Sequence, residues 1–170
     1  ALYVVGQPTD LWKFRLQRLA RSTQGLFPAF KGEAMAAEDQ TIERLLSKLG
    51  DGISGMSHHT DRQRYAALTF ARLTLVQSVQ HKGWLNGDTW YLQTLFGRAL
   101  QQGSNLFFKT CLQPLYQSLA LPAIERPLAL SQSMGKTPFL GHLFDIHPLE
   151  RRYPSLDMID QPFEEILGWM

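Results

Sequence analysis

Apolar residues along this chain recur mostly with the 3.6-residue period of an amphipathic α-helix. A clear case is the segment 38–49, where four apolar side chains occupy positions i, i+3, i+4 and i+7. These four are Ile42, Leu45, Leu46 and Leu49. We predict a helix here that ends before Gly50, because glycine is favoured just after a helix C-terminus.

The longest predicted helix spans residues 60–82, and apolar side chains cover much of its circumference. A helix of this kind packs on more than one side, so we expect it to form the spine of the core. An Asn-Gly turn within residues 84–88 separates it from a predicted helix that ends near Gln102. A further helix over 106–119, capped by Asn105, is predicted before the chain reaches its proline-rich part.

Both ends of the chain give less regular patterns. Residues 2–5 are typical of a short strand, and residues 11–23 fit an amphipathic helix with a basic face. Six prolines interrupt residues 121–162, which we interpret as an ordered, extended connector across the helical body. Asp160 then offers a capping carboxylate for a last helix.

These elements predict a mainly α fold, a helical bundle with an extended Pro-rich C-terminal connector and a short N-terminal strand. We divide the chain into an N-terminal helical segment and loop (1–60), a helical core (61–120) and the connector with its truncated helix (121–170). We expect these three parts to form one compact domain, cut from a longer protein.

Composition narrows the class of protein. Of the 170 residues, 44% are hydrophobic and 19% are charged, which argues against a disordered chain. No apolar run approaches the roughly 20 residues of a membrane-spanning helix, so we expect no membrane partner. A single cysteine, Cys111, permits no internal disulfide and favours a cytoplasmic location.

Several short patterns suggest chemistry but have simpler explanations. The glycines of residues 50–55 match a dinucleotide-binding pattern in letters, yet a helix precedes them where that site needs a strand. His58 and His59 lack further zinc ligands. Cys111 lies on an apolar helix with no neighbouring base. We therefore predict no catalytic residue, no metal ligand and no cofactor-binding residue in this chain.

Basic residues give the best candidates for a binding surface. The net charge of +2 is too small to indicate nucleic acid by itself. Arginines nevertheless occur in two clusters, at residues 62–72 and at 151–152, and could contact phosphates. We select Arg62, Arg64, Arg151 and Arg152 as the predicted nucleic-acid contacts, while solvated helix faces are the commoner explanation of such charges. The aromatic residues, Trp90 included, have helical spacings that predict core packing and not base stacking.

Three sequence segments, in this order along the chain, resemble those of a known family. Residues 82–88 read Lys-Gly-Trp-Leu-Asn-Gly-Asp at the end of the long apolar helix, and 112–116 read Leu-Gln-Pro-Leu-Tyr. Residues 138–145 read Pro-Phe-Leu-Gly-His-Leu-Phe-Asp. Together they resemble the helical region upstream of the catalytic domain in large adenine-specific DNA methyltransferases. These include type IIG restriction–modification enzymes and related phage-defence methylases.

The resemblance covers residues 61–170 and implies a non-catalytic module that links an upstream part to the methyltransferase domain and contacts the backbone of duplex DNA. It implies S-adenosylmethionine as cofactor of the parent family. The chain itself contains neither the Asn/Asp-Pro-Pro-aromatic motif nor the glycine-rich motif of such enzymes. Whether the chain belongs to an enzyme is therefore left open.

Two other hypotheses remain. The chain could be a free-standing helical domain of phage defence that binds a protein partner. It could also be a small hydrolase or metal enzyme, which would require His58, His59 and Asp61 to cluster with further ligands.

Overall fold

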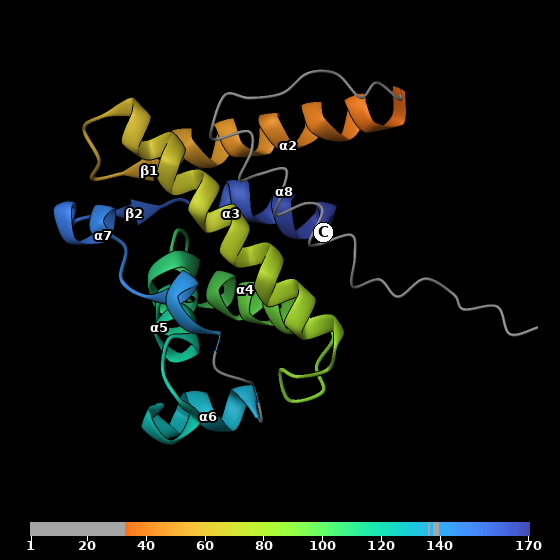
Figure 1. The fold of residues 1–170 in the computed structure, drawn as a ribbon, viewed down its shortest axis with the longest axis vertical. Coiled ribbons are helices and arrows are strands. Elements are labelled where there is room, and N and C mark those ends of the chain that lie inside the picture. The colour runs from red at the N-terminus through yellow and green to blue at the C-terminus, as the bar shows by residue number, and fades with distance from the viewer. Residues whose placement is uncertain (1–32, 136, 138–139) are drawn as a thin grey trace, which may run out of the picture.

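The computed structural model describes residues 33–135, 137 and 140–170 of the chain (Figure 1). These residues form mainly helices, together with one pair of two-residue strands. The predicted mainly α-helical fold is confirmed. The strand predicted at residues 2–5 and the helix predicted at 11–23 lie outside the described residues.

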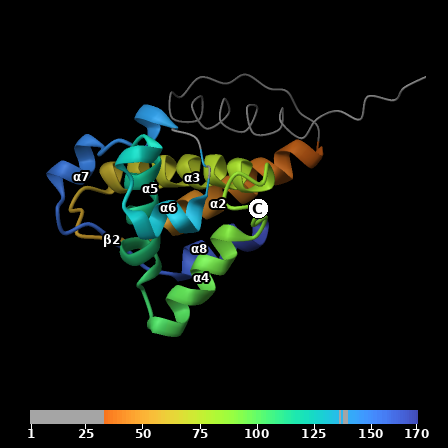
Figure 2. The same cartoon turned by 90° about the horizontal axis from the view of Figure 1, so that it is seen from below.

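Helix α3 (His59–His81) runs through the middle of the molecule, with other helices on several sides of it (Figures 1 and 2). Its bounds agree with the prediction for residues 60–82. Tyr65, Phe70, Leu73 and Val76 are each at most 1% exposed. Because these residues point in different directions around the helix axis, α3 is the spine of the core, as its apolar circumference predicted.

Helix α2 (Glu33–Asp51) packs against α3 and against α8 (Gln161–Trp169). It begins several residues before the predicted start, and it buries Leu45 and Leu49 as predicted. The predicted end before Gly50 is wrong, because Gly50 lies inside the last turn, where a Cβ atom would come within 2.7 Å of Gln63 Nε2. An ion pair fastens α2 to α8 across the surface, with 2.6 Å between Lys48 Nζ and Glu165 Oε1.

Helix α4 (Tyr91–Gln102) follows the predicted turn and lies against α3 and α8. Its first turn receives two side-chain caps. Asp88 Oδ1 accepts a hydrogen bond from the Trp90 amide at 2.7 Å, and the buried Gln80 accepts one from the Leu92 amide at 2.8 Å. The second cap comes from α3, so it joins the start of α4 to the core helix.

The next helical stretch begins as the π-helix η1 (Phe108–Leu112) and continues as α5 (Gln113–Leu119). Asn105 does not cap it. Its side chain instead accepts a hydrogen bond from the Asp160 amide at 3.0 Å. The carboxylate of Asp160 accepts from the amides of Asn105 at 2.6 Å and Phe107 at 3.1 Å. The predicted caps are therefore wrong: Asp160 does not cap its own helix, and it serves a helix start more than fifty residues earlier.

The proline-rich segment contains only short helices, as the prolines predicted, but it is less extended than we expected. Its elements are η2 (Ala123–Glu125), α6 (Leu128–Met134), η3 (Gly141–Phe144) and α7 (Pro148–Arg152). The guanidinium of Arg126 holds this segment together by donating to the carbonyls of Ser118 at 2.8 Å and Thr137 at 2.7 Å.

The antiparallel strand pair joins two distant parts of the chain. Strand β1 (Ile53–Ser54) pairs with β2 (Asp157–Met158), with Ile53 opposite Met158. Gly55 follows at φ 78°, where a Cβ atom would collide with the Ser155 carbonyl. This contact explains one glycine of the 50–55 pattern by close backbone packing.

Within the described part of the chain, no helix combines the length and apolar character that a bilayer crossing requires.

Candidate nucleic-acid interface

The four selected arginines come from two helices that lie far apart in the sequence. Arg62 and Arg64 belong to the start of α3, whereas Arg151 and Arg152 are the last residues of α7. The structure brings the two helices together at one end of the molecule, because α7 is anchored against α3. We call these four residues the arginine cluster.

Asp61 is the point at which the two helices meet. Its Oδ2 atom lies 3.3 Å from Arg152 Nη1 and accepts a hydrogen bond from the Tyr153 hydroxyl at 2.8 Å. Its Oδ1 atom lies 3.9 Å from Arg64 Nη1. The hydrogen bond from Tyr153 and the charge of Arg152 hold the pKa of Asp61 below its usual range. One ionised carboxylate therefore sets the spacing of arginines from both helices.

Three of the four arginines of the cluster are exposed. The side chain of Arg64 is 70% exposed and that of Arg152 is 67% exposed, whereas Asp61 beneath them is 9% exposed. Arg151 is also exposed. Arg62 is half-buried and donates to the Met56 carbonyl at 3.4 Å. Two of the four arginines, Arg64 and Arg152, thus flank one recessed carboxylate, and the cluster carries more positive than negative charge.

A buried polar network fixes α7 to α3. Arg72, which is 1% exposed, places Nη1 2.7 Å from Glu150 Oε1. The hydroxyl of Tyr65 donates to the same oxygen at 2.7 Å. The other guanidinium nitrogens of Arg72 donate to the carbonyls of Leu143 at 2.9 Å and Asp145 at 2.7 Å. Arg72 is therefore a structural residue, and the hypothesis that it contacts phosphate is wrong.

The electrostatics of this network follow from its burial. Burial alone would raise the pKa of Glu150, but the hydrogen bond from Tyr65 and the charge of Arg72 outweigh it and lower that pKa. Burial, reinforced by Glu150, raises the pKa of Tyr65. The network consequently contains an ionised carboxylate and a neutral phenol across the neutral pH range.

His147 caps the start of α7. Its Nδ1 atom accepts a hydrogen bond from the Leu149 amide at 3.2 Å, so this ring nitrogen carries no proton. The Glu150 carboxylate accepts in return from the His147 amide at 2.7 Å, which completes a capping box. Burial and the charge of Arg72 lower the pKa of His147.

In the part of the chain that the structure describes, the other sequence motifs are not joined by the ligands or bases that their proposed chemistry would need. Among the described residues, no group of three or more His, Cys, Asp or Glu side chains could hold a metal ion. His58 and His59 are exposed at the start of α3. Cys111 is half-buried, and its nearest polar contacts are a hydroxyl at 3.5 Å and the Leu95 carbonyl at 3.8 Å. Neither group is a base that could activate the thiol.

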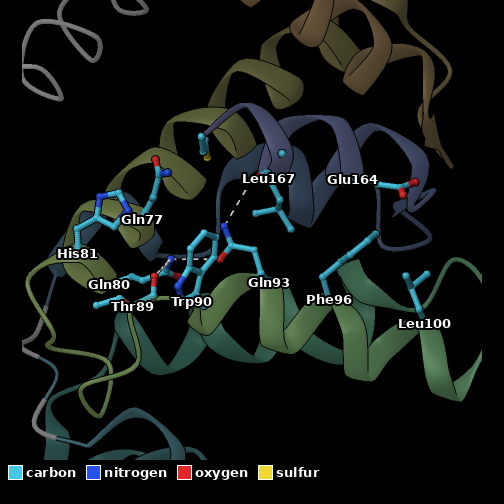
Figure 3. Close-up of a pocket in the computed structure, with 12 residues that line it drawn as sticks. Gln77, Gln80, His81, Thr89, Trp90, Gln93, Phe96, Leu100, Glu164 and Leu167 are labelled. Carbon is cyan, nitrogen blue, oxygen red and sulfur yellow. Dashed lines mark hydrogen bonds between the residues drawn. The ribbon is translucent and has the colours of Figure 1, made fainter.

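Sequence reasoning missed a groove at the other end of α3 (Figure 3). This groove lies between α3, α4 and α8 and has a volume of about 600 Å³. Trp90 lines it and is 67% exposed, although its spacing predicted a core position, so that prediction is wrong. An exposed indole beside polar side chains has no signal in helical periodicity.

No family model, curated protein or solved structure matches this chain. The resemblance to the methyltransferase-associated helical region therefore stays a prediction.

Proposed function

We propose that this chain is a non-catalytic helical module of an adenine-specific DNA methyltransferase or restriction–modification protein, and that the arginine cluster contacts the backbone of duplex DNA. The observation that carries the second part is the convergence of Arg64 and Arg152, from two helices, on Asp61 with about two-thirds of each side chain exposed. Such contacts provide affinity for phosphates that does not depend on sequence.

The buried network supports a fixed geometry for this surface. Glu150 lies within α7, immediately before Arg151 and Arg152, and is held by Arg72 and Tyr65 of α3. The two helices that carry the cluster are thereby kept in one arrangement before DNA arrives, so binding does not have to order the backbone. In this proposal the adjacent methyltransferase domain supplies S-adenosylmethionine and the reaction.

The test compares variants with equal charge changes at two places. Arg64→Ala/Arg152→Ala removes two cluster residues, and Arg44→Ala/Arg98→Ala removes two exposed arginines of α2 and α4. Binding to a random duplex oligonucleotide at about 50 mM salt should weaken at least about tenfold in the double variant. A loss no larger than that of Arg44→Ala/Arg98→Ala would contradict the proposal, because it would reflect net charge alone.

A second candidate function is a protein-binding module of phage defence. The specific observation is an exposed apolar pair on neighbouring short helices, Ile124 at 93% and Leu128 at 74% exposed. Exposed apolar side chains of this size mark protein interfaces when they form a patch. Ile124→Asp/Leu128→Asp should leave DNA binding unchanged under the first proposal. It should abolish copurification of a partner, identified by mass spectrometry, under the second.

A further inference from the structure

Two of the three glutamines that line the groove are fully explained by the fold. Gln80 is buried and donates from Nε2 to the Thr89 carbonyl at 2.6 Å and to Gln93 Oε1 at 3.2 Å. Gln93 in turn donates to the Leu167 carbonyl at 3.5 Å. Figure 3 shows these bonds as dashed lines between α3, α4 and α8. Their role is to hold three helices together.

Gln77 is different. It lies on the same helix as Gln80 and lines the same groove, and it is only 6% exposed. Its side-chain amide nevertheless forms no hydrogen bond with any described residue. Because that amide is not among the fully buried polar groups that lack a partner, it keeps solvent access, and Gln77 lines the groove. Gln77 therefore offers one donor group and one acceptor to a molecule bound in the groove.

The groove that Gln77 lines also contains an exposed aromatic ring and open space. Trp90 exposes two-thirds of its surface at the groove, and Figure 3 shows it between α3 and α4. Gly168 of α8 also lines the groove, and a Cβ atom there would meet no other heavy atom within 4 Å. The groove volume of about 600 Å³ lies in the range of small-molecule sites.

We propose that this groove binds a nucleobase, stacked on Trp90 and hydrogen-bonded to the side-chain amide of Gln77. An indole ring is a good stacking partner for a base because both rings are flat and apolar on their faces. A carboxamide presents a donor and an acceptor side by side, which matches the edge of a base. The base could belong to a free nucleoside or to an unpaired position in a nucleic-acid strand.

Glu164 at the groove restricts which part of a nucleotide can lie there. Its carboxylate is exposed and would repel a phosphate, but it can accept a hydrogen bond from an amino group of a base. His81 provides a further exposed ring on α3. The groove therefore suits the base, while the phosphates of a strand would lie outside it. This site is separate from the arginine cluster and does not rest on it.

The experiment measures binding of the four common ribonucleosides, as free molecules, to the full chain by NMR titration. At least one should bind with a dissociation constant in the millimolar range or tighter. Trp90→Ala and Gln77→Leu should each weaken this binding at least about fivefold. Gly168→Leu should weaken it as well, since the new side chain fills the groove without displacing anything in the fold. Trp84→Ala is the matched control, because Trp84 is an exposed tryptophan that does not line the groove.

Two further arms distinguish the source of the base. A single-stranded oligonucleotide should bind with the same dependence on Trp90 and Gln77 if the base comes from a strand. A fully paired duplex should show no such dependence. The proposal is overturned if neither nucleosides nor single strands bind, or if Trp90→Ala and Gln77→Leu bind them as the wild type does. Duplex binding that requires Arg64 and Arg152, with no binding of nucleosides or single strands, would overturn this proposal and leave the proposed function intact.

Discussion

The two ends of α3 use their polar side chains in opposite ways. At the start of the helix, Asp61 has contacts with Arg64, Arg152 and Tyr153, so its carboxylate is satisfied within the protein. At the end of the helix, the side-chain amide of Gln77 forms no hydrogen bond with any described residue and keeps solvent access. The first end is a preformed charged surface, and the second is a groove with unused hydrogen-bonding capacity. A polar side chain at a surface or groove therefore indicates a binding site only when its hydrogen bonds within the protein are also known.

The largest expected effect concerns the network that anchors the charged end. Glu150→Ala would leave the guanidinium of Arg72 buried and without its carboxylate. The free energy of unfolding should fall by about 3–5 kcal/mol, the usual cost of breaking a buried ion pair. Urea unfolding measures this change. Glu165→Ala, which breaks the half-exposed pair with Lys48 at the surface, should cost about 1 kcal/mol or less. Equal losses in the two variants would show that the network does not anchor α7.

At the groove end of α3, Gln77 and Gln80 should differ in how much they contribute to the free energy of unfolding. Gln80→Leu should lower the free energy of unfolding by about 1–3 kcal/mol, because the Leu92 amide and the Thr89 carbonyl lose their partner. Gln77→Leu should be nearly neutral or stabilising, since it removes an amide that has no bond to lose. Thermal or urea unfolding of both variants measures the difference. A large loss for Gln77→Leu would mean that its amide is already satisfied, and the groove proposal would lose its main support.

Acidification should weaken the charged end through His147. The neutral ring caps α7, and its pKa in the folded chain lies below the value of about 6.5 expected when unfolded. The unfolded chain therefore takes up the proton first. This contribution to stability is complete above pH 6.5 and falls as the pH drops from there towards the folded pKa.

His147→Asn isolates this effect, because asparagine can cap a helix but does not titrate. The free energy of unfolding, measured between pH 7.5 and 5, should fall more steeply for the wild type than for His147→Asn. Parallel curves would show that the imidazole does not act as the cap.

The smallest effect tests the open space around α4. Gly97 lies inside this helix, and a Cβ atom there would meet nothing within 4 Å. Gly97→Ala should raise the free energy of unfolding by about 0.5–1 kcal/mol through helix propensity. It should leave nucleoside binding unchanged, since Gly97 does not line the groove. A loss of stability would mean that the outer face of α4 is covered.

Periodicity predicted the parts of this fold whose stability is local. The bounds of α3 and its burial on several sides follow from its apolar pattern, and α2 buries Leu45 and Leu49 as predicted. The members of the arginine cluster could also be selected from the sequence, because they are basic residues near the start of one helix and at the end of a short one. The sequence did not predict that these two helices meet at Asp61.

Contacts between distant residues could not be predicted in this way. Asp160 has all the sequence signs of a cap for α8, yet its carboxylate binds the amides of Asn105 and Phe107. Arg72 resembles any surface arginine in composition, and only tertiary packing reveals its burial beside Glu150. Trp90 has core spacing but follows a turn that directs it outward. In each case the side chain could contact either sequence neighbours or residues distant in the sequence. The spacing of apolar residues does not show which of these contacts forms.

The most direct test of the central claim, that the arginine cluster contacts the DNA backbone, is the salt dependence of duplex binding by the wild-type chain. Three or four phosphate contacts predict a slope of about −2.7 to −3.6 in a plot of log K against log salt concentration. Affinity should then fall by about 40-fold to 150-fold between 50 and 200 mM salt. Binding that is absent at 50 mM, or that does not change with salt, would contradict the account.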